Sequence, residues 1–468
     1  MACSISGCIT SKIDKEVADK LTRIIISAQD RGRDSFGISS INNELKEVGS
    51  PETKEQVIRD FLESVKDHII INNDRAEPTT EYVKEKTSDD IQPFTFENIM
   101  VTHNGTIAND KELIKQYNLD VKTNVDSAVL APLIHKFLME EGTMVDALKR
   151  LVKVIIGSYA LAVVDKNTPN TLNLITNYKP LALWHDFDTI YFSSFPEYFH
   201  TSPFAEIEEI SPYTIMQLNL QQEEFTFYKY SFAPTLNKTA LVIASGGLDS
   251  TTVAYKLKEE GYKITLLHYN YQQQASTPEL MAVQKLAKNL NCELIQMDSS
   301  IFNYMPSTLT NGSPISKTTS GIDGAQFAHE WVPARNLIFL SIAVGIAESR
   351  GISYVALGNN LEEAGAYPDN EMIFIKKLNN VLPFATAVNK SVQIIQPLGN
   401  LMKHEIVKLG LQLGVPYEDT WSCYEPGVQD DGVLHPCTQC GPCFMRQTAF
   451  MINKSKDPLL TQGFSLLK

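Results

Sequence analysis

The first half of the chain alternates short β-rich runs with a few amphipathic stretches. Apolar residues at helical spacing predict helices at residues 15–29, 54–71, 127–141 and 144–151. Apolar or alternating runs predict strands at residues 4–9, 37–41, 99–102, 158–164, 171–177, 189–193, 214–220 and 224–230. Many strands combined with few helices predict an α+β sandwich for this half.

The second half has a different pattern, in which strands and helices follow one another in turn. Apolar runs predict strands at residues 240–244, 264–268, 293–297 and 354–357. Amphipathic segments predict helices at residues 250–260, 278–290, 336–349 and 403–413. Regular alternation of this kind predicts an α/β domain with a parallel sheet and helices on both of its faces.

A short polar segment at residues 230–238, which contains Pro234, separates the two patterns. It stands directly before the first strand of the alternating half. We therefore expect two domains, at residues 1–232 and 238–468. A chain of 468 residues has room for both at about 100–200 residues each.

Composition and charge favour a soluble enzyme that acts on a small substrate. Hydrophobic residues make up 43% of the chain, and no apolar run reaches the roughly 18–20 residues of a membrane span. The first ten residues do not resemble a signal peptide, so we expect a cytoplasmic protein, or one of the host cytoplasm if the source is viral. Of the net charge of −14, residues 1–235 carry −12, which disfavours tRNA or DNA as a partner without excluding either. The sequence is also compatible with a homodimer.

The sequence Ser245-Gly-Gly-Leu-Asp-Ser250 follows a predicted strand and opens a predicted helix. Glycines let backbone amides approach a phosphate, the start of a helix supplies partial positive charge, and hydroxyls donate hydrogen bonds. Asp249 is a candidate ligand for Mg²⁺. The alternative is an ordinary strand-to-helix turn. We interpret the segment as a phosphate-binding loop for ATP, to which Ser245, Gly246, Gly247, Asp249, Ser250 and Thr251 contribute.

Four of the seven cysteines, Cys423, Cys437, Cys440 and Cys443, lie close together near the end of the chain. Four thiolates at these spacings are typical of a closed structural zinc site. An iron–sulfur cluster or free thiols are the alternatives. Cys8 and Cys292 are expected to be core thiols.

The second half resembles the 7-cyano-7-deazaguanine synthase (QueC-like) family, a branch of the ATP pyrophosphatases. The matching segments include Ser245–Ser250, residues 271–274 with Glu279, residues 332–336, 358–360 and 367–369, Lys403, and residues 421–424 with 437–446. The resemblance implies a substrate or nucleotide pocket that includes Tyr271, Gln273, Arg335, Asn336, Tyr367, Asp369 and Lys403. Gln272, Gln274 and Asn370 depart from the usual family residues.

The first half resembles the class II, or N-terminal-nucleophile, glutamine amidotransferases, which have an αββα sandwich. The matching segments are residues 31–37, the run that begins at Arg75, residues 92–94, His103-Asn-Gly-Thr106, residues 125–127 and residues 157–162. By resemblance, Arg75, His103 and Asp126 bind glutamine, and Asn104 and Gly105 stabilise the oxyanion. The whole chain therefore resembles fused amidotransferase–synthase proteins of bacteria, archaea and phages.

Cys3 is the candidate nucleophile of the amidotransferase half. In that family the cysteine uses its own α-amino group as the base, so it must be the first residue of the mature chain. Here Met1 and Ala2 precede Cys3. We therefore expect both residues to be removed if this half hydrolyses glutamine; otherwise it is catalytically silent.

The two resemblances together imply a ligase that uses ATP and glutamine. It would adenylate 7-carboxy-7-deazaguanine and use ammonia from glutamine to form 7-amido- or 7-cyano-7-deazaguanine. One alternative is an archaeosine-type synthase, which adds ammonia to 7-cyano-7-deazaguanine already placed in tRNA or phage DNA. In another, the first half is a binding module and the amine of a partner is the acceptor. An asparagine synthetase would not be expected to carry the four cysteines.

Overall fold

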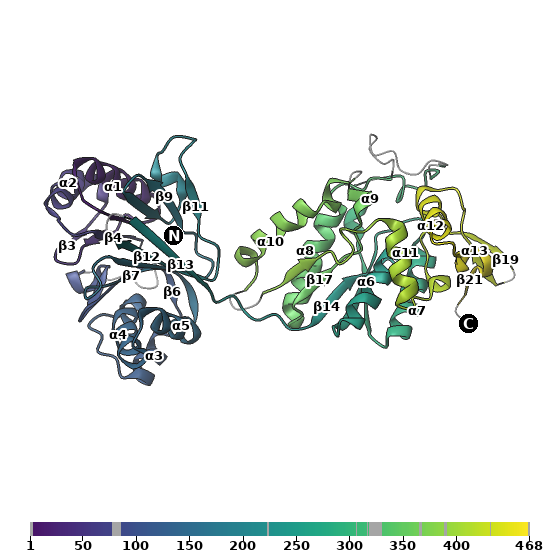
Figure 1. Cartoon of the computed structure of the whole chain (residues 1–468), viewed down its shortest axis with the longest axis horizontal. Coiled ribbons are helices and arrows are strands. Elements are labelled where there is room, and N and C mark those ends of the chain that lie inside the picture. The colour runs from purple at the N-terminus through teal and green to yellow at the C-terminus, as the bar shows by residue number, and fades with distance from the viewer. Residues whose placement is uncertain are drawn as a thin grey trace. The chain divides into compact units, whose positions relative to one another are not determined.

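The computed structural model describes residues 3–76, 86–221, 224–305, 307–315, 317, 330–364, 367–387, 391–430 and 432–466. Met1 and Ala2, and residues 77–81 of the run that begins at Arg75, lie outside the described residues. The chain divides into two compact units, residues 1–233 and residues 234–468 (Figure 1). Each unit is described separately.

Two antiparallel sheets form the centre of the first unit (Figure 1). The seven-stranded sheet has the order β11 (Ile207–Glu209), β9 (Ala182–Asp186), β10 (Thr189–Ser193), β1 (Ser4–Thr10), β4 (Ile69–Arg75), β2 (Ser35–Ser39), β3 (Glu44–Val48). The six-stranded sheet has the order β13 (Glu224–Ser231), β12 (Thr214–Gln221), β8 (Thr171–Thr176), β7 (Gly157–Asp165), β6 (Ile99–Ile107), β5 (Phe94–Phe96).

Helices cover the outer faces of both sheets. Helices α1 (Lys15–Ala28) and α2 (Glu55–Ser64) share a core with the seven-stranded sheet. Helices α3 (Asp110–Tyr117), α4 (Leu130–Glu141) and α5 (Met144–Val154) share a core with the six-stranded sheet. The predicted α+β sandwich of the αββα type is confirmed.

Strand β1 shows how alternation along a strand builds these layers. Ile5 and Ile9 lie in the core between the two sheets, whereas Cys8 lies in the core beneath α1 and α2. Successive side chains of a strand point to opposite faces, so one strand contributes to two cores. All seven residues of β1 are buried, which makes it a central structural element.

The single helix predicted at residues 54–71 is wrong. Helix α2 ends at Ser64, and strand β4 begins at Ile69. Ile69 and Ile71 enter the core between the sheets and Ile70 enters the core under α1 and α2, so no polar position breaks the apolar run. A short run that is buried on both faces has no period by which a strand can be told from a helix.

The second unit contains a five-stranded parallel sheet, as the sequence predicts. Its order is β16 (Glu293–Asp298), β15 (Lys263–Asn270), β14 (Thr239–Ile243), β17 (Tyr354–Ala356), β18 (Gln393–Ile395). Helices α6 (Leu248–Glu259), α7 (Ser276–Leu290), α11 (Lys403–Gln412) and α12 (Gly441–Ile452) contribute to the core on one face. Helices α8 (Arg335–Arg350) and α10 (Met372–Ala385) pack on the other face.

The strand order places β14 between the second strand, β15, and the fourth, β17. The strand order reverses at this point, and the residues after β14 and after β17 lie close together: a Cβ on Gly358 would be 2.8 Å from Ser250 N. In open α/β sheets a ligand binds in the crevice beyond the carboxyl ends of such strands. The phosphate-loop sequence after β14 and the short helix α9 (Leu361–Ala364) after β17 both begin there.

The C-terminal part adds a small three-stranded sheet of β19 (Val428–Asp430), β20 (Val433–His435) and β21 (Phe464–Ser465) and the short helix α13 (Pro458–Gln462). Trp421 and Phe464 are fully buried and meet edge to face, with ring centroids 5.8 Å apart. This aromatic contact links the end of the chain to the loop near the phosphate-binding sequence. Among the described residues, no helix is long and apolar enough to cross a membrane.

Candidate functional site

Cys3 lies directly before β1 and is partly buried. Its Sγ lies 3.7 Å from the carbonyl oxygen of Ala76, and the Nε of Arg31 donates to the Cys3 carbonyl at 3.4 Å. Burial raises the pKa of the Cys3 thiol, while the nearby Arg75 guanidinium acts in the opposite direction. The thiol therefore needs a base close by if it is to act as a nucleophile.

Strand pairing brings the predicted glutamine-site residues together. Ser4 pairs with Asp74, so Cys3 lies near Arg75 at the end of β4. Asn73 Nδ2 donates to the Ser4 carbonyl at 3.2 Å and to the His103 carbonyl at 3.0 Å, which joins the two sheets. Residues from β1, β4 and β6 thereby meet at one place.

His103 and Asp126 hold the loops around this place. His103 is buried; its Nδ1 lies 2.7 Å from Ser127 Oγ, and its Nε2 lies 3.2 Å from the Ser158 carbonyl. Burial lowers the pKa of His103 below its ordinary value, which favours the neutral imidazole. Asp126 accepts hydrogen bonds from the backbone amides of Ile107 at 2.6 Å and Ser127 at 2.7 Å.

The predicted oxyanion pair lies near the end of β6. Asn104 Nδ2 donates to Ser194 Oγ at 3.3 Å, and within the described part of the chain Asn104 Oδ1 is buried without a partner. Gly105 has φ +149°, and a Cβ at this position would lie 1.8 Å from the Ser158 carbonyl oxygen. Only glycine allows β6 and β7 to come this close.

The predicted phosphate loop joins β14 to α6. Gly246 has φ +76°, and a Cβ there would lie 2.7 Å from Ala282 Cβ and 2.9 Å from the Glu279 carbonyl oxygen of α7. The Gly246 carbonyl accepts from Trp421 N at 2.8 Å, and Leu248 N donates to Ser422 Oγ at 3.3 Å. The loop is therefore held in place by the C-terminal part of the chain.

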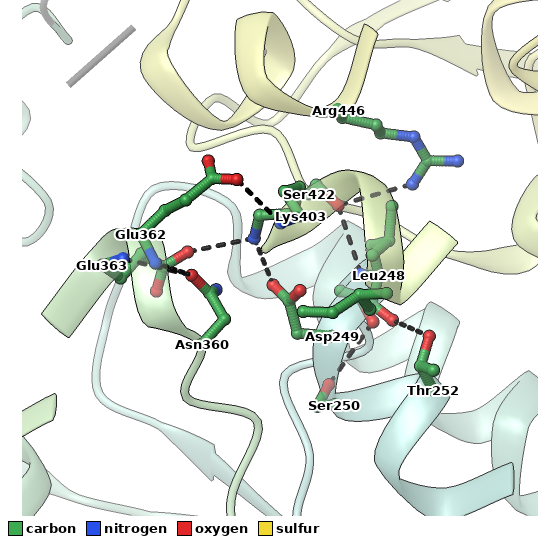
Figure 2. Close-up of polar contacts among 12 residues, drawn as sticks. Leu248, Asp249, Ser250, Thr252, Asn360, Glu362, Glu363, Lys403, Ser422 and Arg446 are labelled. Carbon is green, nitrogen blue, oxygen red and sulfur yellow. Dashed lines mark hydrogen bonds and ion pairs between the residues drawn. The ribbon is translucent and has the colours of Figure 1, made fainter. Parts of the chain in front are cut away.

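One lysine connects the loop to the residues after β17 (Figure 2). Lys403 Nζ lies 2.6 Å from Asp249 Oδ2 and 3.0 Å from Glu363 Oε1. Burial raises the pKa of Asp249, whereas the Lys403 ammonium holds the pKa of Glu363 below its usual range despite burial. Asp249 Oδ1 and Thr251 Oγ1 are buried without a partner in the described residues. These two oxygens are suited to bind a cation or to accept a hydrogen bond from a ligand.

A cavity of about 220 Å³ opens beside this cluster. Of the residues predicted from the sequence, Ser245, Gly247, Asp249, Ser250, Tyr271, Arg335, Asn336 and Lys403 line it. Gly246, Thr251, Gln273, Tyr367 and Asp369 do not line this cavity. Gln273 instead bonds to Glu279 Oε2 at 2.7 Å, Tyr367 stacks on Trp331, and Asp369 accepts from Asn336 N at 3.1 Å.

Six more residues of the cavity wall belong to or adjoin the family segments named above but were given no role there: Glu279, Asn359, Asn370, Ser422, Tyr424 and Arg446. His268 and Glu363 also line the cavity and were not named from the sequence. Arg446 is buried; its Nη2 lies 2.8 Å from Asp457 Oδ1, and its Nη1 lies 3.4 Å from Ser422 Oγ (Figure 2). Asn359 and Glu363 follow the strand β17. Because ligands bind beyond the carboxyl ends of parallel strands, this position in the sequence could have identified both as candidate site residues.

The four C-terminal cysteines converge: their Sγ atoms all lie within 4.8 Å of one another. Cys440 Sγ is 4.0 Å from Cys423 Sγ, and the amides of Glu425 and Cys437 both lie 3.4 Å from Cys423 Sγ. In a tetrahedral zinc site with Zn–S bonds of about 2.3 Å, the sulfurs are about 3.8 Å apart. The cluster fits a bound metal ion.

Comparison with known proteins assigns a family to each half. Residues 239–454 match the family model described as "Queuosine biosynthesis protein QueC", and residues 80–201 match the model described as "Glutamine amidotransferase domain". The first match contains the phosphate loop, the cavity residues and the cysteine cluster. The second contains His103, Asn104, Gly105 and Asp126.

Curated relatives match over the full length. "7-cyano-7-deazaguanine synthase 2" of Sulfurisphaera tokodaii is 44% identical, covering 98% of this chain and 99% of the relative. "7-cyano-7-deazaguanine synthase" of Saccharolobus solfataricus is 45% identical, with the same coverage of 98% and 99%. The synthase of Nitratiruptor sp. is 36% identical and covers 47% of this chain but 97% of the relative. The chain is therefore an ATP-dependent C–N ligase with a glutamine amidotransferase domain, and it belongs to the 7-cyano-7-deazaguanine synthase family.

Proposed function

We propose that this ligase converts 7-carboxy-7-deazaguanine, as the free base, into 7-cyano-7-deazaguanine through the 7-amide, with glutamine as the nitrogen source. The observation that carries the proposal is a cavity in which the phosphate loop, the Lys403 cluster and an aromatic wall formed by Tyr269, Tyr271 and Phe339 meet. The aromatic wall suits a planar base, and the loop suits a triphosphate.

Two activations by ATP account for the chemistry. An oxygen of the substrate carboxylate attacks the α-phosphorus, and pyrophosphate leaves. Ammonia then attacks the carbonyl carbon of the acyl adenylate, AMP leaves and the amide forms. In the second round the amide oxygen is adenylated in the same way; loss of two protons from the nitrogen and departure of AMP leave the nitrile. Each round releases one AMP and one pyrophosphate.

The chain's own residues bind and orient the reactants in these steps. The amides and hydroxyls of Ser245, Gly247 and Ser250, which line the cavity, hold phosphate oxygens, and Gly246 and Thr251 complete the loop. Lys403 balances the negative charge that develops on the α-phosphate and on the departing pyrophosphate. Asp249 Oδ1 is buried and has no partner within the described residues, so it is suited to coordinate Mg²⁺. When bound, that ion would neutralise phosphate charge.

We assign glutamine hydrolysis to residues 1–232 and base activation to residues 238–468. Cys3, as the mature N-terminus, adds through Sγ to the glutamine amide carbon, its α-amino group takes the thiol proton, and ammonia leaves. Water then hydrolyses the thioester to glutamate. Asn104 and Gly105 stabilise the oxyanion, while Arg75, His103 and Asp126 position the glutamine.

We assign zinc to Cys423, Cys437, Cys440 and Cys443. Four thiolates leave no open coordination position, so the metal has a structural role. The cysteine cluster lies at the start of α12, the helix that carries Arg446. The metal would therefore stabilise the part of the chain that holds the phosphate loop.

The proposal is tested by supplying purified protein with 7-carboxy-7-deazaguanine, ATP, Mg²⁺ and glutamine, and following AMP, glutamate and the base by mass spectrometry. We expect AMP, glutamate and the 7-cyano base. Formation of ADP and phosphate would contradict adenylation. Turnover only with tRNA or DNA that carries 7-cyano-7-deazaguanine would favour the archaeosine-type alternative.

A further inference from the structure

The carboxylates that line the cavity differ in their partners. Asp249 and Glu363 both contact Lys403, at 2.6 and 3.0 Å. Glu279, in the first turn of α7, has no ion pair within the described part of the chain. Its Oε2 accepts one hydrogen bond, from the neutral amide of Gln273 at 2.7 Å. Burial raises the pKa of Glu279 to about 7.

Gln273 holds Glu279 in one orientation. Gln273 Oε1 accepts from Tyr271 N at 2.9 Å, and Gln273 Nε2 also lies 3.4 Å from the Tyr269 carbonyl. With its oxygen used by a backbone amide, the Gln273 side chain presents a donor to Glu279. The carboxylate is thus fixed, and it keeps acceptor capacity toward the cavity because each oxygen can accept more than one hydrogen bond.

The surroundings of Glu279 suit a flat heterocycle. Tyr269 and Phe339 stack with ring centroids 4.1 Å apart and an interplanar angle of 2°, and Tyr271 meets Phe339 at 5.5 Å. Arg335 Nη1 donates to Tyr271 Oη at 3.3 Å, which places a fixed cation on the same wall. All of these residues line the cavity. The wall thus combines aromatic surface, one acceptor group and one donor group.

This combination matches one edge of a guanine-type base. A 7-deazaguanine base presents two adjacent donors, N1–H and the 2-amino group, beside the acceptor O6. Adenine presents only its amino group as a donor on the corresponding edge. A carboxylate is the side chain that accepts two adjacent donors, and an arginine is a strong donor to an oxo group.

On the basis of the proposed function, we propose that Glu279, held by Gln273, is the residue that selects the 7-deazaguanine base, accepting hydrogen bonds from N1–H and the 2-amino group while Arg335 donates to O6. The phosphate loop and Lys403 then serve the nucleotide. The cavity thereby distinguishes its two substrates by the hydrogen bonds each can make.

The test compares 7-carboxy-7-deazaguanine with the analogue that lacks the 2-amino group, in the full-length protein and in Glu279→Gln. Calorimetry measures binding of each base, and AMP release gives kcat/KM. Because an unpaired buried polar group costs about 1–3 kcal/mol, wild type should prefer the 2-amino base by about 5- to 150-fold. In Glu279→Gln this preference should fall to within about threefold, with the KM for ATP unchanged. Glu259→Gln, an exposed change of the same charge, is the matched control.

Equal binding of both bases by wild type would overturn the inference, and this result does not depend on the folding of any variant. A variant that keeps the full preference, or one in which the KM for ATP rises instead of the KM for the base, would also overturn it. Failure of the proposed function would give another result: wild type would bind the 2-amino base selectively but would not form AMP from ATP in its presence.

Discussion

The two candidate sites hold their buried ionisable groups in different ways. In the first unit, His103 and Asp74 are buried and bond mainly to neutral groups: serine hydroxyls, amides and carbonyls. In the second unit, Lys403 contacts Asp249 and Glu363, and Arg446 contacts Asp457 at 2.7 Å. The amidotransferase site thus depends on hydrogen bonds to neutral groups, and the synthase site on ion pairs.

This difference follows from the chemistry assigned to each unit. Glutamine hydrolysis uses a thiol and an amide and releases ammonia, which must stay unprotonated to act as a nucleophile. ATP brings a highly charged triphosphate, whose binding needs fixed cations. Burying an ion pair costs desolvation, but removing one partner leaves an uncompensated charge and costs about 3–5 kcal/mol. Single substitutions should therefore be more damaging in the second unit.

The largest effect is expected at the cysteine cluster. Cys440→Ser should lose the metal and most of the soluble protein together, because a structural zinc site contributes roughly 10 kcal/mol or more to folding. Metal content of freshly purified protein, measured by mass spectrometry, checks this. Cys292→Ser, a partly buried cysteine outside the cluster, is the control and should keep about one zinc per chain. Iron in the wild type would contradict the assignment.

The next effect concerns the ion pairs of the synthase site. Asp249→Asn should lower AMP formation by at least about 100-fold, because Lys403 loses a charged partner and the loop loses a carboxylate. Glutamine hydrolysis, which we assign to the other unit, should be retained. Parallel assays of AMP and glutamate measure both, with the exposed change Glu259→Gln as the control. Loss of both activities together would mean that the substitution acts on folding.

A third prediction concerns the buried Asp74 of the amidotransferase unit. Burial raises the pKa of Asp74 from the ordinary 3.8 to about 8. The folded protein therefore holds a proton on Asp74 more tightly than the unfolded chain does. The contribution of this proton to the free energy of unfolding is complete below pH 3.8 and is lost as the pH rises to about 8. Unfolding free energy should fall by up to about 1.4 kcal/mol per pH unit across this range.

Asp74→Asn should remove that slope, since the amide does not titrate. Denaturant unfolding at pH 5 and pH 8 measures it, and the exposed change Asp120→Asn is the matched control. An Asp74→Asn variant with the wild-type pH dependence would show that Asp74 is not the group responsible.

The smallest effect is expected at Gln273, which acts through Glu279. Gln273→Ala should raise the KM for the base by about three- to tenfold, as expected for one lost hydrogen bond, and leave kcat and the KM for ATP unchanged. Gln272→Ala, an exposed neighbour, should change none of these values. A fall in kcat without a change in KM would mean that Gln273 supports the chemical step or the loop instead of base binding.

The sequence predicts best the features that depend on neighbouring residues. The segment Ser245–Ser250 combines glycines, hydroxyls and a helix start in one short run, and the cysteines lie close together in the chain. Alternation of strands and helices was sufficient to predict the parallel sheet. These features are local, so no long-range contact is needed to recognise them.

Features that depend on long-range contacts could not be predicted. Arg446 and Ser422 lie in segments that resemble the family, but that they reach the cavity follows only from the packing of the C-terminal part against the phosphate loop. The boundary between α2 and β4 was missed because Ile69–Ile71 is buried on both faces. The resemblance placed Gln273 in the substrate or nucleotide pocket. Only the hydrogen bonds of the structure show that Gln273 positions Glu279.

The central claim is that glutamine nitrogen from the first unit ends in the base activated by the second. The most direct test supplies amide-¹⁵N glutamine, 7-carboxy-7-deazaguanine and ATP to the protein whose mature N-terminus is Cys3, as verified by intact mass. We predict ¹⁵N in the 7-amido and 7-cyano products, loss of this labelling in Cys3→Ala, and recovery of unlabelled product when that variant receives ammonium at alkaline pH. Unlabelled product from wild type, or full labelling by Cys3→Ala, would contradict the account.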